Sequence, residues 1–153
     1  MQQAEPQKSL LMMLRIIWAA FLIGEGAFAV IVVYMLATGK FQPNHDLQSI
    51  LFTISVVATV IAVPVTYFIR SQVYKRNWQE HAVSREGYFS ANLIFLAVLE
   101  ALAYFSLVTT LVVGKFFPMI VPALACAALQ IINYPTGRLM QPDQIDTNFY
   151  RQP

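Results

Sequence analysis

Residues 16–39 read IIWAAFLIGEGAFAVIVVYMLATG, and Glu25 is the only charged side chain among them. A helix needs about 20 apolar residues to cross the hydrocarbon core of a bilayer, so this run is long enough. Three more runs follow at residues 47–69, 87–114 and 116–137, and Glu100 is the only charge within them. Backbone groups in hydrocarbon must be satisfied internally, and these runs lack the alternation of barrel strands. The sequence therefore predicts four transmembrane helices.

The composition indicates an all-α membrane protein. Hydrophobic residues make up 58% of the chain and charged residues only 12%, whereas a soluble domain carries about 25% charged residues. The four runs leave no room for a separate soluble domain, so we interpret residues 1–153 as one membrane domain. We find no nucleophile triad, phosphate loop, haem motif or metal cluster. We therefore expect no cofactor, no bound metal, no nucleic-acid partner and no catalytic activity of the chain on its own.

Two segments of the chain are similar to each other. Residues 22–43 align with residues 97–118, and this alignment places Glu25 on Glu100. Both segments end in Gly-Lys-Phe-x-Pro. We interpret this as a duplication that gives a four-helix bundle of two tandem parallel helical hairpins. The expected division is repeat 1 at about 9–70, a cytoplasmic or interfacial connection at 71–88, repeat 2 at about 89–138, and a cytoplasmic tail at 139–153.

The positive charges are unevenly distributed between the two ends of the predicted helices. Of the ten Lys and Arg residues, only Lys40 and Lys115 lie in the two short connections on one side. The other eight lie in the N-terminal segment, the middle connection and the tail. Because cytoplasmic segments are enriched in Lys and Arg, we expect both termini in the cytoplasm of a multi-pass protein, in a bacterial inner membrane.

Helix boundaries follow from the caps and breakers. We expect helices at 9–38, with Ser9 as N-cap and Gly39 as terminator, at 47–70, at 89–113 and at 117–133. Apolar spacing after residue 70 predicts that the second helix extends out of the membrane or continues along its surface.

Glu25 and Glu100 are the leading functional candidates. A carboxyl in the bilayer core costs roughly 2.5 kcal/mol or more, and such a residue indicates a functional site by default. No Lys, Arg or His lies at matching depth in the predicted helices, so we expect both to be protonated at rest unless a cation pairs with them. The polar side chains that could support them are Ser55, Thr59, Tyr104 and Gln130. This pattern predicts a site for a proton or Na⁺.

Two other interpretations remain open. The carboxyls could tie helices together through hydrogen bonds, each worth about 0.6 kcal/mol, in a scaffold or assembly subunit of a larger membrane complex. They could also face a Lys or Arg of a partner. The partners expected are the lipid bilayer and either further copies of this chain or other membrane subunits.

Residues 96–108 read LAVLEALAYFSLV and resemble the carboxylate helix of the rotary ATPase proteolipid (c-type) subunits. In that family the ion-carrying Glu is often followed by a small residue, then by an aromatic and by small-Leu-Val, which Ala101, Phe105, Ser106, Leu107 and Val108 match. The resemblance implies a ring-forming subunit in which Glu100 carries a proton or Na⁺. The family also has a glycine-repeat helix and carries its carboxylate in the second helix of each hairpin. Here residues 47–70 contain no glycine, and both acids lie in first helices.

Overall fold

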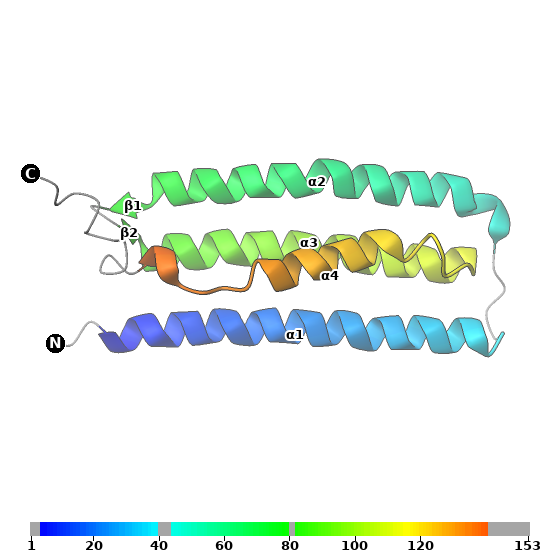
Figure 1. Ribbon diagram of the computed structural model, residues 1–153, viewed down its shortest axis with the longest axis horizontal. Helices are drawn as coiled ribbons and strands as arrows, with labels where there is room; N and C mark the ends of the chain where they lie inside the picture. The colour runs from blue at the N-terminus through cyan, green and yellow to red at the C-terminus, as the bar shows by residue number, and fades with distance from the viewer. Residues whose placement is uncertain (1–3, 40–43, 80–81, 141–153) are drawn as a thin grey trace, which may run out of the picture.

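The computed structural model describes residues 4–39, 44–79 and 82–140. These residues form four α-helices: α1 (Ala4–Ala37), α2 (Gln48–Arg76), α3 (Arg85–Val113) and α4 (Val121–Ile132). The short elements are the 3-10 helices η1 (His45–Leu47) and η2 (Arg138–Met140) and the paired strands β1 (Trp78–Gln79) and β2 (Ala82–Val83). α1 and α3 run in one direction, while α2 and α4 run back (Figure 1). We call the end that holds β1 and β2 the hairpin end, and the end that holds η1 the turn end.

Three of the helices, α1, α2 and α3, are long and apolar enough to cross a membrane. These three confirm the predicted membrane helices in their segments. The fourth segment differs, because α4 has only 12 residues and a helix of that length is about 18 Å long. It begins at Val121 rather than at the expected residue 117. Residues 133–140 then continue toward the hairpin end without forming an α-helix (Figure 1).

The helix α3 is the centre of the bundle. It makes the main contacts of α1, of α2 and of α4, and α1 and α2 lie on opposite sides of it (Figure 1). Its inner side chains, including Phe95, Leu99 and Leu107, are almost completely buried. The bundle is therefore organised around one helix, and α1 and α2 do not pack as the two halves of a separate hairpin.

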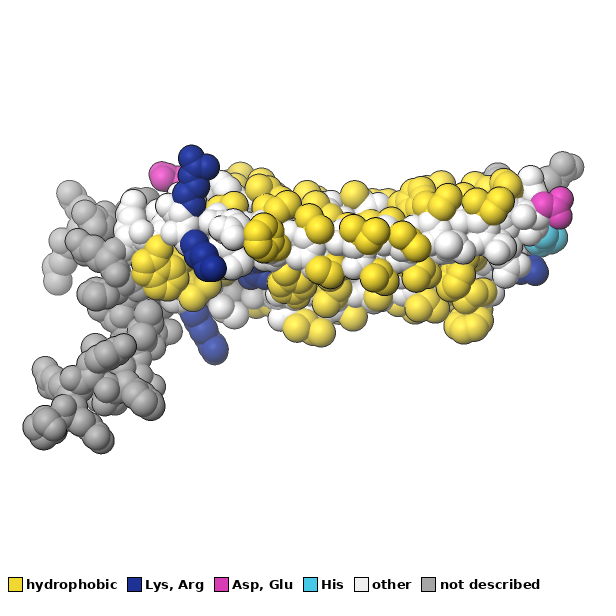
Figure 2. All heavy atoms as spheres, turned by 90° about the horizontal axis from the view of Figure 1, so that it is seen from above, with side chains coloured by type: hydrophobic (Ala, Val, Ile, Leu, Met, Phe, Trp, Pro, Cys, Tyr) yellow, Lys and Arg dark blue, Asp and Glu magenta, His cyan; other side chains and the backbone are white. Residues whose placement is uncertain are grey.

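The middle of the molecule has an apolar surface. Large side chains of α1 and α2 are exposed there, among them Ile23, Val30 and Phe68. Figure 2 shows this apolar band over α2. Lys and Arg side chains gather mainly at the hairpin end, where an acidic side chain also lies, and acidic, His and basic side chains lie at the turn end. An apolar band between two polar ends is what a bilayer requires of a spanning protein.

The helix ends agree with the sequence in part. Gly39 and Gly114, which align in the repeat, both have the positive φ expected of helix terminators, +63° and +72°. Ser9 is not an N-cap, because α1 already begins at Ala4. The extension of the second helix is confirmed as far as Arg76. Beyond it the helical prediction is wrong, because Asn77 ends α2 and the chain turns into the β1–β2 pair.

Side chains of other helices satisfy the backbone around the end of α4. Arg15 Nε donates to the Pro135 carbonyl at 3.2 Å, and Trp18 Nε1 donates to the Gln130 carbonyl at 2.9 Å. The backbone N–H of Gly137 donates to Tyr88 Oη at 3.1 Å. Irregular backbone at membrane depth is tolerated only where protein satisfies it. These contacts therefore explain why residues 133–140 can follow the bundle without a helix.

Candidate functional site

The two carboxyls at matching positions of the two similar segments meet at one amide. Gln130 Nε2 donates to Glu25 Oε2 and to Glu100 Oε2, both at 3.3 Å. The exposed fractions of Glu25, Glu100 and Gln130 are 6%, 8% and 0%. The three side chains come from α1, α3 and α4, near the middle of the two long helices. We call Glu25, Glu100, Gln130 and the neighbouring Tyr104 the acid–amide cluster.

Close packing of α1 against α3 brings this cluster together. A Cβ atom built on Gly24 would lie 2.8 Å from Tyr104 Oη and 3.9 Å from Glu100 Oε1. The side chains of Tyr104 and Glu100 thus reach the α1 backbone at Gly24, where no side chain stands in the way. One turn further along α1, the Phe28 ring packs edge-on against the Tyr104 ring, with 5.3 Å between centroids. These contacts hold Tyr104 beside Glu100.

Gly24 and Gly26 provide a matched pair of substitutions. We expect Gly24→Ala to destabilise the protein by about 1–3 kcal/mol, because the new methyl group crowds the Tyr104 hydroxyl. Gly26→Ala meets nothing within 4 Å, so it should be neutral or stabilise α1 by up to about 1 kcal/mol. Unfolding in mixed micelles measures both. The Gly24→Ala penalty should shrink in a Tyr104→Phe background; an equal penalty with and without the Tyr104 hydroxyl would show that the contact is not its cause.

The amide of Gln130 is fixed but incompletely bonded. Its backbone carbonyl accepts the Trp18 hydrogen bond, while its side-chain Oε1 is buried without a partner among the described residues. Which end of an amide is oxygen is assigned from its hydrogen bonds, and here the NH₂ end faces both carboxyls. The cluster thus holds two donor groups, the Gln130 amide and the Tyr104 hydroxyl, which is hydrogen-bonded to Glu100, against a larger number of oxygen acceptors. Unsatisfied buried acceptors are costly, so a proton or a cation would stabilise the arrangement.

No Lys, Arg or His of the described residues forms an ion pair with either carboxyl. Two neighbouring carboxylates that share a site disfavour each other's ionised form. From the sequence we expected no Lys, Arg or His at the depth of the two carboxyls. In residues 9–39, 44–79 and 82–140 the packed structure likewise shows no ion pair to either of them. A single added positive charge at the cluster would balance one of the two acids.

Of the four polar side chains predicted to support the carboxyls, the structure brings Tyr104 and Gln130 to them. Ser55 instead pairs with Thr109 between α2 and α3, with 3.3 Å between the hydroxyl oxygens. Thr59 donates to the Ser55 carbonyl of its own helix at 2.8 Å. Both hydroxyls therefore already have other partners, Ser55 in the α2–α3 contact and Thr59 within α2.

Sequence reasoning missed a second polar cluster nearer the hairpin end. Arg70 Nη1 donates to Asn133 Oδ1 at 2.8 Å and Arg70 Nε donates to Tyr74 Oη at 2.9 Å. Asn133 Nδ2 donates to Tyr67 Oη at 2.6 Å, and Asn92 Nδ2 donates to Tyr74 Oη at 2.8 Å. The signal was present in Asn92, which is the only amide side chain within the third apolar run.

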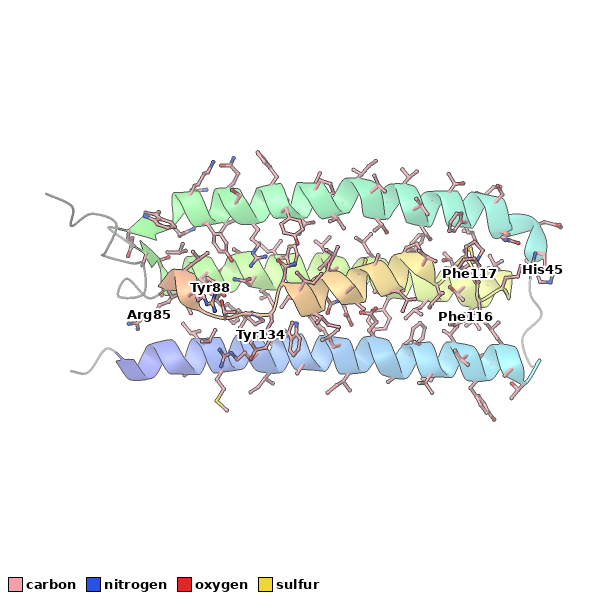
Figure 3. All side chains as sticks on the ribbon, viewed as in Figure 1. His45, Arg85, Tyr88, Phe116, Phe117 and Tyr134 are labelled. Atoms are coloured by element: carbon pink, nitrogen blue, oxygen red, sulfur yellow. The ribbon has the colours of Figure 1, made fainter. Side chains whose placement is uncertain are left out.

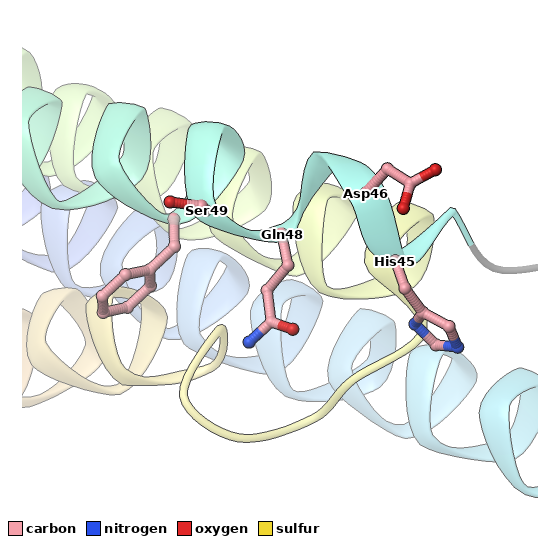
Figure 4. A pocket seen from close by; sticks show the side chains of 5 residues that line it. His45, Asp46, Gln48 and Ser49 are labelled. Carbon is pink, nitrogen blue, oxygen red and sulfur yellow. The ribbon is translucent and has the colours of Figure 1, made fainter.

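An open hollow of about 420 Å³ lies at the turn end of the bundle (Figure 4). It is lined by His45, Asp46, Gln48, Ser49 and Phe52. His45 Nδ1 lies 3.0 Å from the Val113 carbonyl, so one ring nitrogen is already engaged. Within the part of the chain that the structure describes, no group of three or more His, Cys, Asp and Glu could hold a metal ion.

Comparisons with protein-family models, with curated proteins and with solved structures found no match for this chain. The likeness of residues 96–108 to the proteolipid subunits therefore stays a prediction.

Proposed function

We propose that this chain is a small integral membrane subunit that binds and exchanges a proton or Na⁺ at Glu25 and Glu100. The observation that carries the proposal is that both buried carboxyls share the single amide of Gln130 and have no cationic partner among the described residues. Placing acids at this depth is costly. Two acids on separate helices that converge on one donor form a site that gains from one bound positive charge.

The chemistry follows from the count of donors and acceptors. An ionised carboxylate only accepts hydrogen bonds, whereas a protonated carboxyl also donates one. With one of the acids protonated, its O–H could satisfy the other carboxylate or the unpaired Gln130 Oε1. A Na⁺ ion would instead use these oxygens as ligands. Tyr104 Oη, which lies against Gly24 beside Glu100, supplies a further oxygen for either occupant.

The hairpin end is proposed to face the cytoplasm. Lys75 and Arg76 end α2 there, and Lys and Arg side chains gather at this end in Figure 2. The positive-inside rule then places the start of α1 on the same side. We extend this to a bacterial inner membrane, where a proton or Na⁺ gradient would drive exchange at the cluster.

A scaffold role is the second candidate, and one observation favours it. The hydrogen bonds of Gln130 join α1, α3 and α4, so the cluster could serve only to tie these helices within a larger complex. Under this alternative, Glu→Gln substitutions preserve the hydrogen bonds and should be tolerated. Glu→Leu substitutions should weaken assembly.

The test is the double variant Glu25→Gln/Glu100→Gln, because Gln keeps the size of the side chain but cannot release a proton. In the wild-type chain reconstituted in liposomes, we expect a carboxyl infrared band that changes with bulk pH or with Na⁺, labelling by dicyclohexylcarbodiimide, and ion flux. All three should disappear in the double variant while its expression and melting behaviour remain. Full flux in the double variant would contradict the proposal.

A matched control separates ion exchange from the loss of any acid. Glu86→Gln removes a carboxyl in the exposed first turn of α3, away from the cluster. It should leave the band, the labelling and the flux as in the wild type. If the wild-type carboxyl band does not respond to bulk pH or to Na⁺, the carboxyls do not exchange ions and the scaffold role stands.

A further inference from the structure

Arg70 is a charged side chain at the edge of the apolar part of the bundle. It lies 22 residues after Gln48, the first residue of α2, which is about 33 Å along a helix. That distance is close to the roughly 30 Å thickness of the hydrocarbon core. Arg15 lies a similar distance from the end of α1 at Ala37. Both arginines therefore lie at the depth of the lipid phosphates at the hairpin end.

The guanidinium of Arg70 is held in place entirely by neutral groups. It donates to Tyr74 Oη at 2.9 Å and to Asn133 Oδ1 at 2.8 Å. Its carbon lies 4.8 Å from the centre of the Phe95 ring and 5.5 Å from that of Tyr74. These contacts fix the orientation of the group, but none of them provides an anion for its charge. A guanidinium carries five N–H donors, and the bonds above use two of them.

The surrounding residues offer no counter-ion at this level. Arg70 forms no ion pair with Asp or Glu of the described residues. Glu86 is the nearest acid in α3 toward the hairpin end, and it precedes Phe95 by nine residues, which is about 13 Å of helix. Glu100, five residues after Phe95, is engaged by Gln130 in the acid–amide cluster. A half-buried charge is costly near hydrocarbon when its described neighbours are all neutral, so an anion from outside these residues would stabilise it.

The neighbourhood suits a lipid headgroup. Tyr67 and Tyr134 are partly exposed at the end of α4, with exposed fractions of 38% and 39%, and such aromatic side chains are typical of the membrane interface. Figure 3 shows Tyr134 between the end of α4 and α1. There the guanidinium carbon of Arg15 lies 5.4 Å from the centre of the Tyr134 ring. Two arginines therefore flank the end of α4, one on the α1 side and one on the α2 side.

We propose that Arg70, with Asn133 and Tyr67 beside it, binds the phosphate of an anionic lipid headgroup between α2 and α4. Arginine matches phosphate oxygens through its planar fork of N–H donors. Nε and one Nη1 hydrogen point to Tyr74 and Asn133. The remaining N–H groups have no partner among the described residues, and we infer that they face the headgroup. The lipid would lie along the exposed apolar side chains of α2 and α4, of which Ile69 and Ile132 are nearest in sequence to Arg70 and Asn133.

The experiment titrates the detergent-purified full chain with phosphatidylglycerol, with phosphatidylcholine and with inorganic phosphate, and follows thermal unfolding and lipid adducts in native mass spectrometry. We expect phosphatidylglycerol to raise the melting temperature and to be retained, and the other two additives to do neither. In Arg70→Gln the affinity for phosphatidylglycerol should fall about tenfold, which corresponds to about 1.4 kcal/mol. Equal stabilisation by inorganic phosphate would show a free-anion site and overturn the lipid assignment.

Arg76→Gln is the matched control, because it removes the same charge from an exposed position of the same helix. It should bind phosphatidylglycerol as the wild type does. If Arg76→Gln and Arg70→Gln lose affinity equally, the lipid recognises general surface charge and the proposed site is wrong. Should Arg70→Gln fail to fold, Arg70→Lys provides the second variant. Lysine keeps the positive charge but cannot keep the bonds to Tyr74 and Asn133 together with the planar set of N–H donors. The affinity for phosphatidylglycerol should therefore also fall, and wild-type affinity in Arg70→Lys would contradict the site.

Discussion

Gln130→Leu is expected to lower the unfolding free energy by about 2–6 kcal/mol, because two buried carboxyls lose their common donor at once and each unsatisfied group costs about 1–3 kcal/mol. Both carboxyls accept from Gln130 Nε2 at 3.3 Å, and Gln130 itself is completely buried. Leu has nearly the volume of Gln, so the loss should come from the hydrogen bonds rather than from a cavity. Unfolding in mixed micelles measures the difference.

A triple variant tests the cause of that loss. Replacing all members of a buried hydrogen-bonded group by apolar side chains of similar size can be nearly neutral. Glu25→Leu/Glu100→Leu/Gln130→Leu should therefore recover most of the stability that Gln130→Leu loses, although it abolishes ion exchange. A Gln130→Leu variant as stable as the wild type would show that the amide does not hold the two carboxyls.

Gly137→Val is expected to release the segment 133–140 from the bundle. Gly137 has φ +80°, and a Cβ atom there would lie 2.8 Å from Leu11 Cδ2 and 3.3 Å from Met140 Cε. A left-handed conformation costs an L-residue about 1–2 kcal/mol, and overpacking adds about 1–3 kcal/mol. The Gly137 N–H to Tyr88 Oη bond should break, so hydrogen exchange and proteolysis of residues 133–140 should accelerate.

Gly39→Val is the control for the backbone part of this effect. Gly39 has φ +63°, and a Cβ atom there meets nothing within 4 Å. It should show only the backbone cost and leave the exchange of residues 133–140 unchanged. Equal loss of stability in both variants would show that the contact with Leu11 and Met140 adds nothing.

The sequence predicted the long helices because uninterrupted apolar runs with a terminating glycine, such as Gly39 and Gly114, determine them locally. It did not predict the short α4. The N–H of Gly137 and the carbonyl of Pro135 are satisfied by Tyr88 and Arg15, which are far away in the sequence. Pairings of that kind depend on tertiary packing, and no local pattern of residues 117–140 reveals them.

The residues of the candidate site were also predicted only in part. The apolar runs gave the depth of each polar side chain, and depth was enough to bring Gln130 together with Glu25 and Glu100. It was not enough for Ser55 and Thr59, because the rotation of α2 about its axis decides their partners. That rotation directs Ser55 to Thr109. Apolar α2 has no strongly polar face from which its rotation could be predicted.

The central position of α3 has a consequence for biosynthesis. Both α1 and α2 make their main contacts with α3, yet they leave the ribosome before it. When the first 84 residues have entered the bilayer, Glu25 has met neither Glu100 nor Gln130, and two apolar helices have only lipid as neighbours. The native bundle can thus close only after the third helix has been made, and Glu25 lacks its hydrogen-bond partner Gln130 until α4 follows.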